Sequence, residues 1–351
     1  MSKRLLALHR WMSLIFAVFW LAQVLTGMFI TFHWEARDLA IAGAHQRTDL
    51  VAIGRQISSL EEGKDVRVKS VWTTAGRADR YYLNLSTGEK VRILGDGSII
   101  EYSLADSSRF FNTLVRIHHN LLVGDVGKTI IGISGILLFF NLIIAFNIAW
   151  SRRGMLKRQP WPSKRLPSRG RLFHFHLLFG AVAVIPALIL VGSGVLLRYE
   201  SSVAGVLGAE LPKISQVADS GTGHVTFSEA ASTAMAAIPG SKLTSVNMPT
   251  EENAFYQFRL LEPGELRRAY GKSYVTVNAK NGNIISIFPA SEAPFAISFV
   301  NALYAIHVGE AGGLLGRIFI TVLGLWLLIL IVLGLKLWWI RTAAKVETHR
   351  N

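Results

Sequence analysis

The chain has 351 residues, of which 51% are hydrophobic, and a formal net charge of +14. It contains no cysteine, which excludes disulfides and thiolate-ligated zinc or iron–sulfur centres. Basic residues gather near the two termini and between Ser151 and Phe173, where eight of them occur without an acidic residue. Because positive charge beside apolar segments reports membrane topology, this excess does not indicate a nucleic-acid partner.

Four segments are long and apolar enough to cross a bilayer, which takes roughly 20 residues of helix. Three of them, Trp11–Phe32, Thr129–Trp150 and Leu177–Leu197, contain no charged residue, and the fourth, Ile318–Leu335, continues through Lys336 into more apolar sequence. The chain is therefore predicted to be a polytopic membrane protein embedded in a lipid bilayer. Since positive flanks stay in the cytoplasm, both termini and the short linker are expected inside and both long loops outside.

The sequence around the fourth apolar segment repeats that around the second. With an offset of 189, the eight residues that end at His118 align with the eight that end at His307. The alignment continues without a gap, so that Lys128 meets Arg317. A repeat of this length predicts two copies of one structural unit.

The first and third segments also correspond. An offset of 167 aligns His9 with His176 and Thr26-Gly27 with Ser193-Gly194, whereas an offset of 165 aligns His9 with His174. The first offset pairs small residues at more points, but the choice between His174 and His176 stays open. Both copies run in the same direction, which predicts parallel repeats whose equivalent residues face each other across an axis along the membrane normal.

Each long outer loop is predicted to form a small α+β domain. Alternation of apolar and polar residues at Tyr81–Leu85 and Ser273–Val277 indicates strands, and Asp96-Gly97 and Asn281-Gly282 are hairpin-turn signals. In the second loop, residues 227–238 have helical apolar spacing and end before a Pro-Gly pair. The linker between the repeats, which contains three prolines among its basic residues, is expected to be an extended surface strap.

Four histidines occupy matching positions beside the apolar segments. His9 and His176 lie at the cytoplasmic ends of the first and third segments, and His118 and His307 lie just outside the second and fourth. Two opposed neutral imidazoles are suitable axial ligands for haem iron, so one haem is expected near each face of the membrane. The alternative is that these histidines are structural or contact lipid headgroups, and that duplication copied them.

Other polar residues have weaker claims on a cofactor. Lys128 and Arg317 could pair with haem propionates or could anchor the helices at the membrane surface. His33, beside Trp34, and His119 are interpreted as non-ligands, because His33 has no histidine partner in the repeat and His119 points away from His118 on a helix.

The motifs around these histidines resemble the PepSY-associated transmembrane family. Leu8-His9-Arg10-Trp11 is similar to the family's first helix, and Ile306-His307-Val308-Gly309 followed by Leu337–Arg341 is similar to its last. Residues 224–287 resemble a PepSY module. The sequence departs from the family pattern at His118-His119-Asn120, where the glycine is missing, and at Phe173–His176, where His-Arg is absent.

The resemblance implies a mainly α-helical membrane protein with four transmembrane helices as two parallel repeats and two small periplasmic PepSY-like α+β domains. It also implies the bacterial inner membrane, with both termini cytoplasmic. The expected segments are transmembrane helix 1 (1–35), periplasmic domain 1 (36–108), an outer helix with transmembrane helix 2 (109–151), the basic cytoplasmic linker (152–172), transmembrane helix 3 (173–199), periplasmic domain 2 (200–297), an outer helix with transmembrane helix 4 (298–341) and the cytoplasmic tail (342–351).

Members similar to this chain include ferric-siderophore reductases with two b-type haems, which pass electrons outward so that Fe(III) chelates release Fe(II) in the periplasm. Hard oxygen chelators hold Fe(III) better than the softer Fe(II), so reduction favours release. The sequence has no glycine-rich nucleotide fingerprint, so the electron donor is expected to be external, on the cytoplasmic side or in the membrane. No catalytic side chain is assigned. The aromatics Trp72, Tyr81 and Tyr82 could dock the chelate or pack in a core.

Two other classes of protein fit parts of the sequence. A membrane-anchored PepSY module that binds or regulates a periplasmic partner would explain the loops but not the recurring histidines. A transporter is disfavoured, because the uncharged segments contain no Asp or Glu to couple ions and four helices offer a small pathway.

Overall fold

The structure is a computed structural model that describes residues 3–38, 47–63, 65–73, 80–100, 105–210, 224–250, 252–266 and 270–348. The chain divides into two compact units. The helical unit comprises Met1–Phe32, Phe110–Glu200 and Ile306–Asn351, and the sheet unit comprises His33–Arg109 and Ser201–Ala305.

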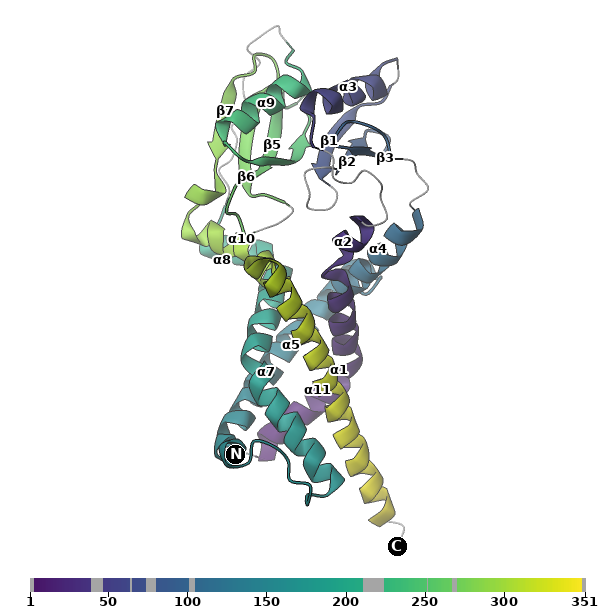
Figure 1. Ribbon diagram of the computed structural model, residues 1–351, viewed down its shortest axis with the longest axis vertical. Coiled ribbons are helices and arrows are strands. Elements are labelled where there is room, and N and C mark those ends of the chain that lie inside the picture. Colours follow the sequence, from purple (N-terminus) through teal and green to yellow (C-terminus); the bar gives the residue numbers. More distant parts are fainter. Residues whose placement is uncertain are drawn as a thin grey trace. The chain divides into compact units, whose positions relative to one another are not determined.

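Four long helices build the helical unit: α1 (Lys3–Ile30), α5 (Gly124–Ser151), α7 (Ser168–Arg198) and α11 (Gly313–Thr348). Each contains a stretch long and apolar enough to span a membrane, which confirms the four predicted segments. α1 packs on α5, α5 on α7, α7 on α11 and α11 on α1 (Figure 1). α1 and α7 therefore lie on one diagonal of the bundle, and α5 and α11 lie on the other.

The basic linker between α5 and α7 differs from the predicted extended strap. It contains the short helix α6 (Arg153–Arg158), and α7 begins at Ser168 directly after Pro167. Basic residues are good helix formers, and proline is tolerated at the start of a helix because the first backbone N–H groups have no partner there. The guanidinium of Arg152 lies 4.9 Å from the ring centre of Phe173. The linker is thus partly helical and packs on the beginning of α7.

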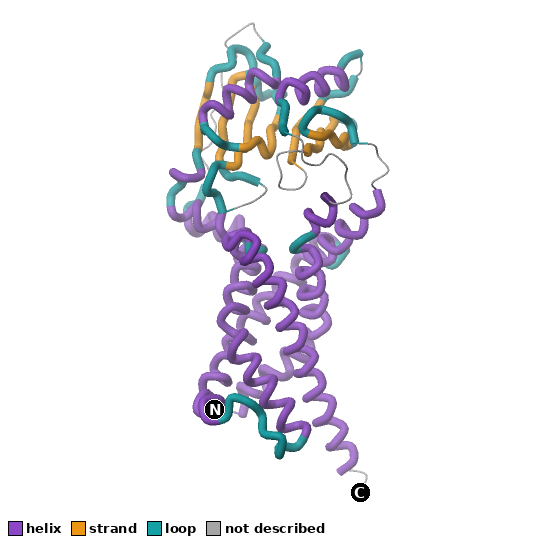
Figure 2. The backbone as a smooth tube through the Cα atoms, in the orientation of Figure 1, coloured by secondary structure: helices purple, strands orange, loops and turns teal. Residues whose placement is uncertain are grey.

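One antiparallel sheet forms the centre of the sheet unit (Figure 2). Its strands are β1 (Val68–Thr73), β2 (Arg80–Leu85), β3 (Lys90–Leu94), β4 (Lys242–Asn247), β5 (Phe255–Leu261), β6 (Ser273–Asn278) and β7 (Ile284–Phe288), in the spatial order β3-β2-β1-β4-β5-β6-β7. β1 of the first loop pairs with β4 of the second, with Trp72 opposite Ser245. The expectation of two separate domains is corrected here: the loops share one sheet, because joining the two edges removes unpaired backbone groups and enlarges a small core.

The apolar core lies on one face of this sheet. Helices α3 (Leu50–Glu61) and α9 (Phe227–Ala237) cover that face and pack with the strands into a single cluster (Figure 1). α9 begins as predicted, with the Thr226 side chain accepting from the Glu229 backbone and Glu229 accepting from Thr226. Tyr81 is fully buried in this core, and its hydroxyl bonds to Thr48. Its side chain is therefore not placed to touch a ligand.

Shorter helices connect the strands to the long helices: α2 (His33–Asp38), α4 (Ala105–Asn120), α8 (Glu200–Leu207), α10 (Phe295–His307) and the 3-10 turns η2 (Ala290–Glu292) and η3 (Glu310–Gly312). α4 ends two residues after His118, and α10 ends at His307. These two histidines therefore sit at the last turns of the helices that lead into α5 and α11.

Candidate functional site: two histidine pairs

The structure brings four of the predicted histidines together as two pairs. The ring centres of His9 on α1 and His176 on α7 are 6.4 Å apart, across the diagonal of the bundle. The ring centres of His118 on α4 and His307 on α10 are 6.3 Å apart. His176, and not His174, faces His9, because residues two apart on a helix point roughly 200° away from each other.

Asn141 on α5 orients the ring of His9. Its Nδ2 donates to Ser13 Oγ at 3.0 Å, so its Oδ1 is the acceptor that lies 2.9 Å from His9 Nδ1. The His9 Nδ1 therefore carries the proton, and the lone pair is on Nε2. Asn141 is only 3% exposed, which leaves it little freedom to turn away.

The rings of the second pair are fixed in the same way. His307 Nδ1 donates to the backbone carbonyl of Leu190 at 3.0 Å. His118 Nδ1 lies 3.1 Å from Thr26 Oγ1, whose own hydrogen is donated to the Ala22 carbonyl. In both histidines, Nδ1 is thus the donor and Nε2 is left with its lone pair.

Two glycines allow these rings to approach the long helices. A Cβ on Gly27 would lie 3.1 Å from Cε1 of His118, and one on Gly194 would lie 2.6 Å from Cε1 of His307. The two glycines are 167 residues apart and the two histidines 189 apart, the offsets of the sequence alignment. A larger residue at either position would displace the neighbouring imidazole.

Burial keeps the second pair of imidazoles neutral. It lowers the pKa of His118 to about 3, with smaller contributions from the neighbouring His307 and His119. Burial likewise lowers the pKa of His307 below its ordinary value. Neutral imidazole is the form that binds metal ions, so these side chains are ready to act as ligands at physiological pH.

The spacing of each pair fits two imidazoles on opposite sides of one metal ion. Two metal–nitrogen bonds of roughly 2.0 Å, as imidazole makes to zinc, and about 1.1 Å from each nitrogen to its ring centre, sum to about 6.2 Å. The measured separations of 6.4 and 6.3 Å agree with this value.

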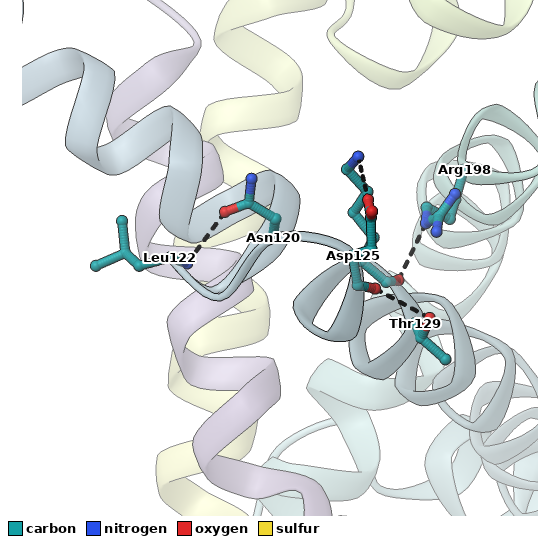
Figure 3. Close-up of polar contacts among 6 residues, drawn as sticks. Asn120, Leu122, Asp125, Thr129 and Arg198 are labelled. Atoms are coloured by element: carbon teal, nitrogen blue, oxygen red, sulfur yellow. Dashed lines mark hydrogen bonds and ion pairs between the residues drawn. The ribbon is translucent and has the colours of Figure 1, made fainter.

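An unusual turn between α4 and α5 holds His118 in place. Leu121 and Leu122 have left-handed backbone angles, with φ of 51° and 65°, and Asn120 Oδ1 accepts from the Leu122 N–H at 3.1 Å (Figure 3). The Asn120 carbonyl lies so close to Gly127 that any Cβ there would overlap it. Asn120 can therefore stand where the family pattern has glycine, because the two leucines adopt the left-handed conformation and the amide side chain supports the turn.

The corresponding turn before α11 uses glycines instead. Gly309 and Gly313 have φ of 80° and 59°, and a Cβ on Gly316 would overlap the carbonyl of Gly309. Both turns thus bring a backbone carbonyl against a glycine of the following long helix. The contact fixes the distances from His118 and from His307 to the long helices.

The matched residues Lys128 and Arg317 differ in their surroundings. Arg317 is 4% exposed, donates to the backbone carbonyl of Thr31 at 2.6 Å and lies 4.3 Å from the ring centre of Phe32. Lys128 instead forms a 2.7 Å ion pair with the exposed Asp125. Arg317 is thus the better placed of the two to meet a buried anionic group.

Arg198 has a role that sequence comparison missed. Its Nε donates to the backbone carbonyl of Lys128 at 3.0 Å, the bond drawn to Arg198 in Figure 3. Under the two offsets, Arg198 aligns with Thr31 and Lys128 with Arg317. In both halves an arginine therefore donates to a backbone carbonyl, but the arginine is Arg198 on α7 in one half and Arg317 on α11 in the other. The sequence contained this signal, because each pair of aligned positions includes one arginine.

The histidines interpreted as non-ligands lie elsewhere. The ring of His33, at the start of α2, packs 5.3 Å from the ring of Trp34. His119 is exposed, with its ring centre 5.9 Å from that of His118. His224 lies directly before α9, and His45 and His349 fall outside the described residues.

A search among curated proteins found none that matches the chain. The family model described as the PepSY-associated TM region matches residues 6–341. This match covers both histidine pairs, the sheet, α5 and α7, and most of α1 and α11, and the chain therefore belongs to the PepSY-associated TM family.

Proposed function

We propose that this protein is a transmembrane electron carrier that holds two b-type haems and reduces a ferric siderophore in the periplasm. His9 and His176 hold one haem, and His118 and His307 hold the other. A haem bound by these imidazoles would supply one-electron redox chemistry. The observation that carries the proposal is the separation of the paired ring centres, 6.4 and 6.3 Å.

The hydrogen bonds at Nδ1 support a ligand role over a purely structural one. The Nδ1 atoms of His118 and His307 are hydrogen-bonded to Thr26 and to the Leu190 carbonyl, so each Nε2 keeps a lone pair that a metal ion can use. The bonds at Nδ1 also make each ring a stronger ligand and set its orientation.

The repeat supports placing His118 and His307 on one shared haem. Gly27 with His118 and Gly194 with His307 make equivalent contacts at the sequence offsets, as expected of two parallel repeats. Arg317 is the proposed partner of an outer haem propionate, because guanidinium pairs strongly with carboxylate in buried surroundings. Lys128 is the weaker candidate, since its side chain is 46% exposed and a solvated charge pairs less strongly.

The charge distribution supports placing both termini and the basic linker in the cytoplasm, and the family supports the bacterial inner membrane. The sheet unit then lies in the periplasm as a PepSY-like module that receives the substrate. The electron donor acts from the cytoplasmic side or from within the membrane. One electron delivered to a bound Fe(III) chelate gives Fe(II), which oxygen ligands hold less tightly, so the iron is released.

The test is spectroscopic. Detergent-purified protein is expected to show a Soret band, to give sharp α and β bands on reduction with dithionite, and to contain about two haems per chain. The reduced protein, mixed anaerobically with a ferric chelate, is expected to reoxidise while a ferrous trap such as ferrozine develops colour. A colourless protein that co-purifies with a periplasmic peptidase would instead favour the second candidate function, a membrane-anchored module that regulates a partner.

Replacing Asn141 by leucine is expected to weaken haem binding at the inner pair by about 10- to 100-fold, the usual effect of losing a ligand's hydrogen-bond partner. Leucine keeps the volume but leaves His9 Nδ1 and Ser13 without their partner. Haem titration of the apoprotein, followed at the Soret band, measures the change. Asn147→Leu is the matched control, since Asn147 bonds only within its own helix. Equal haem affinity in both variants would remove Asn141 from the site.

A further inference from the structure

One row of side chains crosses the whole sheet on the face opposite α3 and α9. The residues paired in register from β3 to β7 are Arg92, Tyr82, Trp72, Ser245, Arg259, Tyr274 and Phe288. Four of the seven are aromatic and two are arginines. On a strand, such residues lie side by side on one face, so the row is a continuous strip.

A second row runs beside the first on the same face. It consists of Lys90, Asn84, Ser70, Asn247, Gln257, Thr276 and Ser286, again one residue from each strand in register. Every member is an amide, a hydroxyl or a lysine, and neither row contains Asp or Glu. We call the two rows together the polar face. It combines positive charge, aromatic rings and hydrogen-bonding groups.

Arg259 is the centre of this face. Its guanidinium carbon lies 6.0 Å from the ring centre of Trp72, 6.0 Å from that of Tyr270 and 5.8 Å from that of Tyr274. Its Nε donates to the Gly271 carbonyl, which fixes the plane of the group. Within the described residues, no carboxylate forms an ion pair with Arg259, and three aromatic rings surround its guanidinium group.

A second pair of the same kind lies towards the β3 edge, where the Arg92 guanidinium is 5.5 Å from the ring centre of Tyr82. Trp72, Tyr82 and Tyr274 are all half-buried, so part of each ring remains accessible. Tyr270 stands against Trp72, with ring centres 5.9 Å apart, and extends the aromatic surface beyond the sheet. Arg92 and Arg259, neither of which is paired with a carboxylate among the described residues, are well suited to bind an anion.

We propose that the polar face binds the ferric chelate, and that this chelate is an anionic tris-catecholate. The proposal rests on the proposed function and specifies its substrate class. A tris-catecholate complex of Fe(III) carries three negative charges and presents aromatic rings, so it complements both the arginines and the aromatic side chains. Lys90, Asn247 and Ser286 of the second row are exposed and can donate to catecholate oxygens, whereas Thr276 is fully buried. A tris-hydroxamate complex is neutral at the metal and aliphatic, and it would use neither the charge nor the rings.

Redox-inactive gallium(III) chelates test this recognition separately from electron transfer. Binding of a gallium complex with a hexadentate tris-catecholate, and of one with a hexadentate tris-hydroxamate, is measured by calorimetry on the full-length protein in detergent. The catecholate complex is expected to bind at least about tenfold more tightly, and more weakly at high salt. Because gallium is not reduced, this result is independent of the haem spectrum, and either proposal can fail alone.

Variants locate the site. Arg259→Gln and Arg92→Gln are each expected to weaken catecholate binding about three- to tenfold and to flatten its salt dependence. Arg55→Gln is the control, because Arg55 is exposed on α3, whose helix covers the opposite face. Arg92 lies near the sheet edge, so its variant remains informative even where Arg259→Gln disturbs folding. Equal affinity for the two gallium chelates, no binding of either, or unchanged catecholate affinity in Arg92→Gln would overturn the proposal.

Discussion

Replacing His118 by alanine is expected to lower the haem content of the purified protein from about two per chain to about one, because a bis-imidazole site loses one of its two axial ligands. His307→Ala is expected to give the same result. The variant with both His118→Ala and His307→Ala is expected to keep about one haem per chain, since both residues serve a single site. His9→Ala and His176→Ala remove the other haem. Pyridine haemochrome analysis, normalised to protein, measures each value.

Two neighbouring histidines provide the controls. His119→Ala removes an exposed ring next to His118, and His174→Ala removes a buried ring two residues before His176. Both variants are expected to retain about two haems per chain. Loss of haem in His174→Ala with retention in His176→Ala would transfer the inner ligand to His174. Full haem content in all four pair variants would end the haem assignment.

Gly127→Ala is expected to destabilise the protein by roughly 1–3 kcal/mol and to remove the haem held by His118 and His307. A Cβ at this position overlaps the Asn120 carbonyl, which is backbone and cannot rotate aside. The turn must therefore open, and His118, which lies two residues before Asn120, moves with it. Thermal unfolding followed by circular dichroism gives the loss of stability, and haem content reports the site.

Gly180→Ala is the matched control, because Gly180 lies within α7 and a Cβ there has no neighbour within 4 Å. Alanine favours helix over glycine by about 1 kcal/mol, so this variant is expected to be as stable as the parent or slightly more stable. Similar melting temperatures and haem contents for the two variants would show that the close approach at Gly127 is dispensable.

The sequence allowed the long helices to be predicted, but not their ends. Hydropathy marks Trp11–Phe32, whereas α1 runs from Lys3 to Ile30. The helix extends into basic residues because lysine, arginine and leucine all have high helix propensity, and hydropathy does not measure propensity. For the same reason, α6 was not predicted: its basic residues favour helix, but the prolines of the linker suggested extended chain.

Local signals also sufficed for two strands of the sheet, β2 and β6, and for two of its turns. The Asp96-Gly97 turn is formed, with Ile93 bridging to Ile99, and the Asn281-Gly282 turn joins β6 to β7. The pairing of β1 with β4 could not be predicted in this way. It joins residues from different loops, and edge pairing depends on backbone groups that every strand possesses.

The histidine pairs were accessible from the repeat, because equivalent residues on parallel copies face each other. The choice of His176 over His174 was not, since both offsets align with His9 and only the rotation of α7 about its axis separates them. The acceptor for His307 is the backbone carbonyl of Leu190. Every residue has such a carbonyl, so the residue type at this position does not indicate the bond. Side-chain partners such as Asn141 are easier to anticipate, because a buried amide in an apolar helix needs a partner.

The pairing of β1 with β4 has a consequence for biosynthesis. During translation, the three-stranded part from the first loop is complete long before β4 leaves the ribosome, and β1 meanwhile has an unpaired edge. Such an edge can recruit a strand from another nascent chain. The cell must therefore shield this half-sheet, or finish the second loop quickly, to avoid forming mispaired oligomers.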